Sequence, residues 1–491
     1  MIKSCNTTIS SKTLAVTRLV RFARDEGGAV IYLSLLFLFL MLIMTGMAVD
    51  FMRFESRRTM LQSVTDRAVL AAADLDQDKD AKEVVIDFFE KAGYSEDNIL
   101  DIDVIDLKDF NSVGVTARKD INTIYLRMLD QYVLSAPAAA TALEGVSNVE
   151  VSLVVDISGS MRDPVTPADG STSTKTKIQA LREAAKTFAE TVLTDKFKDK
   201  ISMSFVPYSE HVNAGPDLMT AMSTPRVHNW SHCMEFASSD FSKTGLNVPG
   251  NYPQMQHFQW NPDVRDGWYQ NTVVDTVCPQ YDYERIVPLT QNLSALTTQI
   301  DKLQPRAGTS IFLGLKWGLA LLDRSMQPAV SNLISQGAVD TAFSGRPVAY
   351  PQDGEAADTQ KIIVLMTDGE NDKSMRLQDS VYSTANHYAH WASHNFQYFR
   401  YREIANENDA NWFYQKYDKT TGDRYMGQLC DLAKENGVII YTVAVEATAN
   451  GQKEMAKCAS SNAHFFNASG ADLETIFGAI AKQITELRLS L

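Results

Sequence analysis

Five oxygen-bearing side chains stand out because they border apolar runs. Asp156, Ser158 and Ser160 follow one run in EVSLVVDISGS, and Asp368 follows another in KIIVLMTDG. Thr309 lies between them in AGTSI, just before an apolar helical segment. Carboxylate and hydroxyl oxygens are the hard ligands that Mg²⁺ or Mn²⁺ prefers. These residue types predict a metal site holding Mg²⁺ or Mn²⁺, provided that the fold brings the three segments together.

The elements that would position these residues alternate between strands and helices. Near-continuous apolar runs, typical of strands buried on both faces, occur at 150–156, 200–209, 361–369 and 438–446. Helical patterns occur at 175–195, 289–303, 310–323, 424–437 and 471–489. This alternation predicts an α/β fold with a doubly wound, mostly parallel sheet over residues 148–491. Ligands of such sheets bind beyond the carboxyl ends of the strands, where all five side chains would meet.

The DxSxS motif at Asp156, Ser158 and Ser160, with Thr309 and Asp368 in the same order, resembles the von Willebrand factor type A domain. This resemblance implies a metal-ion-dependent adhesion site. Ser158 and Ser160 would then ligate the metal directly, and Thr309 in some states. Asp156 and Asp368 would often act through water, and a partner protein would offer an Asp or Glu carboxylate to the open position. A degenerate domain that lost its metal is the alternative.

Two long insertions interrupt the alternation, at about 211–288 and 370–421. Insertions of this size usually lie near the loops above the sheet. In the second insertion, His387, His390 and His394 would share one helical face, and three imidazoles there could bind Zn²⁺ or Cu²⁺. An aromatic, partly solvated face is the other interpretation.

Residues 29–49 form a run of 21 residues without a charge. At about 1.5 Å per residue, a helix of this length spans about 32 Å, enough for the core of a lipid bilayer. We therefore predict one transmembrane helix at 29–49, continued outward by a helix at 50–75. A cleaved signal peptide is the alternative, but its apolar core is shorter, at about 7–15 residues.

Basic residues in the predicted tail at 1–28 favour a cytoplasmic N-terminus. The predicted location is the inner membrane of a diderm bacterium, with one membrane pass and the C-terminal bulk in the periplasm. The cysteines fit this topology, because Cys5 lies on the cytoplasmic side and the other four on the far side. We expect disulfides Cys233–Cys278 and Cys430–Cys458, since each pair falls within one region of the sequence, although free buried thiols remain the alternative.

A small α+β module is predicted at 76–147. It would contain a helix at 80–93, strands at 98–107 and 112–121, a second helix at 121–130 and a third strand at 132–145.

The segments RDEGGAVIYLSLLFLFL and AVDFMRFESRRTMLQSVTDRAVLAAADL, which span 24–40 and 48–75, resemble the N-terminal region of TadG-like proteins of the tight-adherence (Flp) pilus machinery. Those are single-pass proteins with a von Willebrand factor type A domain outside the cytoplasm. The resemblance implies a role in pilus assembly or anchoring, with other pilus-assembly or pilin proteins as partners.

Several other functions lack their residues. The net charge of −14 argues against a nucleic-acid partner, because phosphate binding needs a basic surface. The sequence contains no HExxH, GxSxG or GxxxxGK[ST] motif, so we predict no enzyme activity. A hydrolase using the same Mg²⁺ would have only Asp163 or Glu370 as a nearby base. A surface adhesin that binds host or abiotic ligands is the main competing hypothesis.

Overall fold

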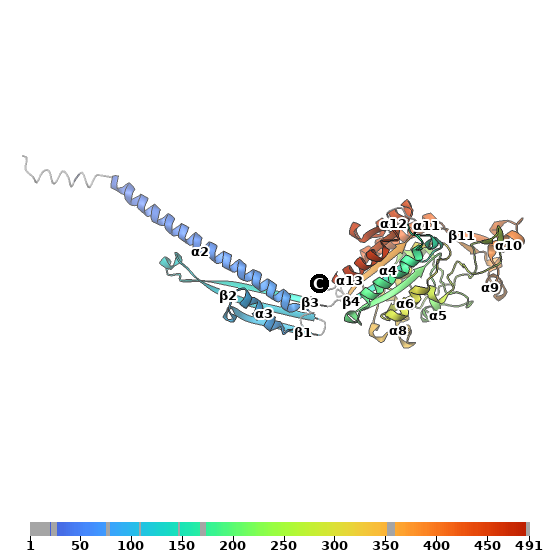
Figure 1. Cartoon of the computed structure of the whole chain (residues 1–491), viewed down its shortest axis with the longest axis horizontal. Coiled ribbons are helices and arrows are strands. Elements are labelled where there is room, and N and C mark those ends of the chain that lie inside the picture. Colours follow the sequence, from blue (N-terminus) through green and yellow to red (C-terminus); the bar gives the residue numbers. More distant parts are fainter. Residues whose placement is uncertain are drawn as a thin grey trace, which may run out of the picture. The chain divides into compact units, whose positions relative to one another are not determined.

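The computed structural model describes Val20 and residues 27–74, 79–107, 110–145, 148–166, 173–350 and 359–487. The chain divides into two compact units, Met1–Gly145 and Val146–Leu491 (Figure 1). Cys5 and the predicted cytoplasmic tail, apart from Val20, Gly27 and Gly28, lie outside the described residues.

One continuous helix, α2 (Gly27–Ala73), runs through the predicted membrane segment and its predicted extension. Apolar side chains in its first half face outward, and Tyr32 and Met41 are 77% and 65% exposed. Among the described residues, this is the one helix long and apolar enough to cross a membrane, judged by length and composition. This exposed apolar surface suggests a single-pass membrane anchor.

The second half of α2 packs on a small antiparallel sheet of the same unit. The core joins Leu61 and Val69 of α2 to Val85 and Phe89 of a second helix and to the middle strand of the sheet. The strand order is β1-β2-β3. The elements are α3 (Ala81–Lys91), β1 (Ile99–Leu107), β2 (Phe110–Asn122) and β3 (Val133–Gly145).

The predicted helix at 121–130 is wrong except for one 3₁₀ turn, Leu126–Leu129. Residues 121 and 122 instead belong to the β2–β3 ladder, and the Thr123 N–H donates to the Tyr132 carbonyl at 3.0 Å, which closes the hairpin. The buried Asp50 carboxylate of α2 accepts the N–H groups of residues 124, 125 and 126 at 2.7 to 3.1 Å. A contact distant in sequence therefore fixes this turn.

The second unit is built on a six-stranded sheet with the order β13-β12-β9-β4-β5-β8. Every pairing in it is parallel except that of β8, the edge strand beside β5. From β4 the chain builds the sheet to one side and then crosses over to build the other, so the order reverses between β4 and β9. The predicted doubly wound, mostly parallel sheet is confirmed. Its strands are β4 (Asn148–Asp156), β5 (Ile201–Tyr208), β8 (Val287–Thr290), β9 (Thr359–Thr367), β12 (Ile439–Val445) and β13 (Phe465–Ala468).

Helices cover both faces of this sheet (Figure 1). Alternate side chains of β4 enter different cores: Val151 and Leu153 contact one helical layer, and Val154 contacts the other. The first layer is α4 (Lys177–Val192), α6 (Leu293–Lys302) and α13 (Leu473–Leu487). The second is α5 (Gly215–Ala221), α7 (Ile311–Ala320), α8 (Gln327–Ser335), α11 (Lys419–Glu435) and α12 (Ala449–Cys458).

The two insertions pack against each other. Met255 and Phe258 of the first insertion share a buried cluster with Leu377, Trp391 and Phe396 of the second. The first insertion contains α5, β6 (Asp263–Arg265) and β7 (Trp268–Gln270). The second contains β10 (Ser374–Leu377), α9 (Ala385–Trp391), α10 (Phe396–Arg402) and β11 (Phe413–Tyr417), with β10 antiparallel to β11.

Candidate metal centre

The sheet brings the ends of β4 and β9 together. These strands are parallel neighbours, and Val155 lies opposite Met366 in the ladder. Asp156 is the last residue of β4, and Asp368 directly follows β9. They therefore meet where the strand order reverses, which is the usual ligand position in a doubly wound sheet.

Four of the five predicted ligands form one hydrogen-bonded cluster. The buried Asp156 carboxylate accepts the Ser158 N–H and the Thr367 hydroxyl, each at 2.7 Å. The Ser160 hydroxyl donates to Asp368 Oδ1 at 2.6 Å and lies 3.1 Å from Ser158 Oγ. The oxygens that the motif predicted as ligands are therefore adjacent in space.

Thr309 reaches this edge on the loop before α7. The Gly159 N–H donates to the Ala307 carbonyl at 2.9 Å, which joins the loop to the DxSxS segment. The Asp372 N–H donates to the Thr309 carbonyl at 2.8 Å, which joins it to the segment after β9. Thr309 Oγ1 lies 3.8 Å from the position that a Cβ atom on Gly369 would take. All three predicted loops therefore meet.

The charge of this cluster is not balanced. Burial, and after it the charge of Asp368, raise the pKa of Asp156 to about 7. The buried Lys177 ammonium pairs with Asp368 Oδ2 at 3.0 Å and offsets one of the two carboxylates. Ionised Asp156 leaves an excess negative charge among carboxylate and hydroxyl oxygens, which fits a divalent cation such as Mg²⁺. The residues present therefore fit the metal that the sequence predicted.

Sequence reasoning missed Lys177 and Thr367. Lys177 opens α4, where the helix dipole disfavours a positive charge. That misplaced charge was a signal that the side chain has a carboxylate partner. Thr367 precedes Asp368 directly, but only the strand register shows that its hydroxyl reaches the carboxylate of Asp156.

The two acidic residues considered as bases are placed differently. Asp163 is exposed, and its main-chain carbonyl accepts the Lys177 N–H at 2.9 Å. The Glu370 carboxylate accepts the Thr448 hydroxyl at 2.9 Å and lies 3.4 Å from the Lys419 ammonium.

The predicted three-histidine face is wrong. Helix α9 ends at Trp391, so His394 does not continue the face of His387 and His390. The Asn395 side chain caps a new helix, α10, immediately afterwards. The rings of His390 and His394 stack at 4.1 Å, and His394 Nδ1 lies 2.9 Å from the His390 carbonyl oxygen. Among the described residues, no group of three or more His, Cys, Asp or Glu side chains could hold a metal ion.

The structure forms both expected disulfides. Cys233–Cys278 lies in the buried cluster between the insertions. Cys430–Cys458 joins α11 to α12.

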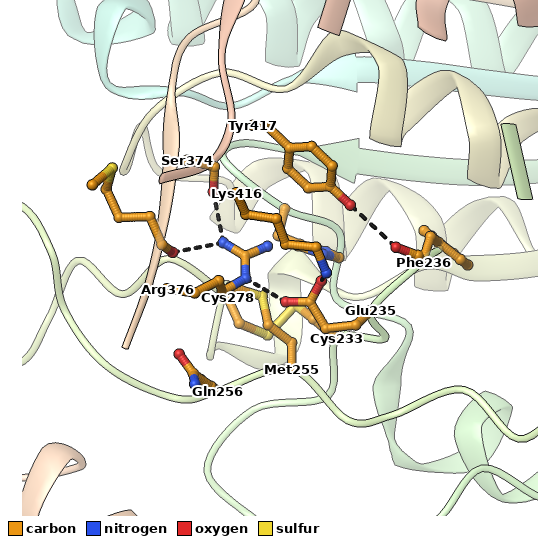
Figure 2. Close-up of polar contacts among 12 residues, drawn as sticks. Cys233, Glu235, Phe236, Met255, Gln256, Cys278, Ser374, Arg376, Lys416 and Tyr417 are labelled. Carbon is orange, nitrogen blue, oxygen red and sulfur yellow. Dashed lines mark hydrogen bonds and ion pairs between the residues drawn. A yellow bond between two sulfur atoms is a disulfide. The ribbon is translucent and has the colours of Figure 1, made fainter. Parts of the chain in front are cut away.

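A buried ionic network joins the two insertions to each other (Figure 2). Arg376 of β10 donates to Ser374 Oγ at 2.8 Å and pairs with Glu235, which also pairs with Lys416 of β11. The Ser374 hydroxyl donates to Glu210 Oε1 at 2.8 Å.

Glu210 is the end of this network nearest the metal centre. Burial raises its pKa to about 7. Its carboxylate lies 3.4 Å from the position that a Cβ atom on Gly308 would take. The insertions therefore support the loop that presents Thr309.

Residues 27–75 match the family model described as "Tad: Putative Flp pilus-assembly TadE/G-like". The N-terminal segment resembles TadE/G-like pilus-assembly proteins. No curated protein matches the chain. The TadE/G-like match covers α2 and lies in the Met1–Gly145 unit, whereas the candidate metal centre lies in the other unit.

Solved structures of pilus proteins show a weak overall likeness. The von Willebrand factor domain of the type V pili tip protein Mfa5 from Porphyromonas gingivalis is 13% identical with a TM-score of 0.33, over 70% of this chain and 97% of that one. The PilB minor pilin from Streptococcus sanguinis is 14% identical with a TM-score of 0.32, over 80% of each chain. The pilus adhesin SpaC from Lactobacillus rhamnosus GG is 12% identical with a TM-score of 0.32, over 79% of this chain and 34% of that one, so this chain spans about a third of SpaC. The doubly wound fold of the Val146–Leu491 unit is assigned from its own strand order and loop geometry, and not from these structures.

Proposed function

We propose that this protein is a membrane-anchored component of Flp-type pilus assembly or anchoring that binds a partner protein through a metal-dependent site. Ser158, Ser160 and Thr309 would hold Mg²⁺ or Mn²⁺ together with Asp156 and Asp368. The observation that carries this proposal is the connected oxygen cluster, with its unbalanced charge, at the strand-order reversal. The TadE/G-like match of α2 supports the pilus context.

The charges explain why the partner would offer a carboxylate. When both carboxyl groups are ionised, Asp156, Asp368 and Lys177 together carry one formal negative charge. With a divalent cation bound, the same group carries one formal positive charge. Mg²⁺ supplies a coordination position for an oxygen ligand, and a carboxylate of the partner would restore neutrality there. The Ser160–Asp368 hydrogen bond and the Lys177 ion pair hold the oxygens in place before the partner arrives.

The proposed location follows from α2 and the disulfides. The exposed apolar half of α2 would lie in the inner membrane, with the N-terminus in the cytoplasm. The Val146–Leu491 unit would then lie in the periplasm, an oxidising compartment in which Cys233–Cys278 and Cys430–Cys458 persist.

The experiment is complementation of a deletion strain, with surface pili counted by electron microscopy. We expect wild type and Asp163→Ala to restore pili, and Asp156→Ala to fail at an equal protein level. Asp163 is the matched control because it is a nearby exposed Asp outside the cluster. Normal pili with Asp156→Ala would contradict the metal-dependent role, and normal pili in the deletion strain would contradict the pilus role altogether.

A further inference from the structure

A cavity of about 410 Å³ lies beside the candidate metal centre, and three arginines line it. Arg162 comes from the turn after the DxSxS motif, Arg182 from α4, and Arg306 from the loop before Thr309. Among the described residues, no Asp or Glu lines the cavity. A basic cavity is unexpected on a chain with a net charge of −14. We call it the arginine pocket.

The arginine pocket shares its wall with the metal-centre loops. The Arg306 N–H donates to the Ile157 carbonyl at 2.9 Å, between Asp156 and Ser158. Arg162 Nη2 donates to the Pro305 carbonyl at 3.4 Å, which is a second contact between the same two loops. A ligand on the metal centre would therefore have the pocket next to it.

Two of the three guanidinium groups have carbonyl rather than carboxylate partners. Arg182 Nε donates to the Leu303 carbonyl at 3.1 Å, and the contact of Arg162 is also with a carbonyl. Arg306 differs, because it lies 3.6 Å from Glu284 and its guanidinium stacks 4.5 Å above the Tyr281 ring. Arg162 and Arg182 thus form no ion pair with a carboxylate of the described residues, although the charge of Arg162 acts on the nearby Asp275 carboxyl group. Guanidinium groups bind carboxylates with paired hydrogen bonds.

We propose that the arginine pocket binds a second carboxylate of the partner, so that the partner is an acidic segment with at least two Asp or Glu residues. One carboxylate reaches the metal centre and the other lies against Arg162 and Arg182. This inference rests on the proposed function, and it specifies the chemistry of the partner. It also explains why a strongly acidic protein keeps a basic cavity at this position.

The test uses the full-length protein in detergent and a fluorescein-labelled peptide of six glutamates, with binding followed by fluorescence anisotropy in Mg²⁺ at low salt. We expect Arg162→Gln/Arg182→Gln to weaken binding about fivefold, the sum of two partly exposed ion pairs. The charge-matched control is Lys186→Gln/Lys198→Gln, outside the pocket lining, and it should change binding less than about twofold. Arg162→Gln alone, at an exposed side chain, should give about half of the effect on a logarithmic scale and guards against a folding defect.

The outcomes separate this inference from the proposed function. If EDTA and Asp156→Ala remove binding but the pocket variants match the control, the inference is overturned and the metal-dependent function stands. If the pocket variants weaken binding while EDTA has no effect, the pocket stands and the metal-dependent function fails. If none of these changes alters binding, both fail.

Discussion

The two ends of the six-stranded sheet each bury a lysine–carboxylate pair, but the pairs differ in balance. At the amino end, the Lys361 ammonium contacts Glu150 at 2.6 Å and the carbonyls of Leu322 and Val348 at 2.6 and 2.8 Å. At the carboxyl end, Lys177 offsets Asp368, and Asp156 remains as a second buried carboxylate. The pair at the amino end is balanced in charge and has a structural role. The group at the carboxyl end has a second carboxylate and favours a bound cation. The charge balance therefore distinguishes a candidate binding site from a scaffold within the same sheet.

The largest expected effect is a loss of stability at the amino end of the sheet, where the lysine–carboxylate pair is balanced. Lys361→Met should lower the free energy of unfolding by about 3 kcal/mol, because the buried Glu150 loses its ion-pair partner and, among the described residues, keeps only the Val348 N–H and the more distant charge of Arg346. All six tryptophans lie in the Val146–Leu491 unit, so denaturant unfolding followed by tryptophan fluorescence reports on this unit.

The control for this prediction removes both charges. Lys361→Met/Glu150→Leu should regain much of the lost stability, since apolar side chains can replace a buried ion pair at little cost. A double variant as unstable as the single one would show that packing, not charge balance, governs this end.

The next largest effect is stabilisation by Mg²⁺ at the carboxyl end of the sheet, where the charge is unbalanced. At a Mg²⁺ concentration one hundred times its Kd, the wild-type protein should be about 2.7 kcal/mol more stable than in EDTA, because the ion binds only the folded state. Ser160→Ala should abolish this gain, whereas Lys361→Met should keep it on a lower baseline. Equal unfolding midpoints of the wild-type protein in Mg²⁺ and in EDTA would contradict the metal site.

Sequence alone predicts the sheet and the residues of the oxygen cluster at its edge, because both depend on local patterns. Strands buried on both faces leave apolar runs, and their carboxyl ends meet at one edge whatever the details of packing. The turn at 121–130 and the end of α9 at Trp391 depend instead on contacts distant in sequence or on competing caps, such as Asp50 and Asn395. The Lys177–Asp368 pair was missed for the same reason, since 191 residues separate its partners.

The smallest expected effect is the loss of stability in Lys177→Met. This variant gives the sharpest comparison of the two ends, because it tests whether Mg²⁺ can replace the charge of a lysine. In EDTA, Lys177→Met should cost about 2 kcal/mol, less than Lys361→Met, because the Lys177 side chain is 8% exposed and that of Lys361 fully buried. The Ser160 hydroxyl also still donates to Asp368. In saturating Mg²⁺ most of this loss should disappear, and the Kd for Mg²⁺ should fall, since a competing positive charge has gone.

Lys177→Arg keeps the charge and is the matched control for this last variant, with an unfolding midpoint in EDTA expected near that of the wild type. Lys361→Met provides the opposite reference, because the described residues at its end form no group of metal-binding side chains, and Mg²⁺ should not reduce its loss. If Lys177→Met lost the same stability with and without Mg²⁺, its pair with Asp368 would be structural like that of Lys361. The unbalanced charge would then have no ligand to explain it. A loss that Mg²⁺ relieves at one end of the sheet only would show that the second carboxylate, Asp156, converts a structural ion pair into a binding site.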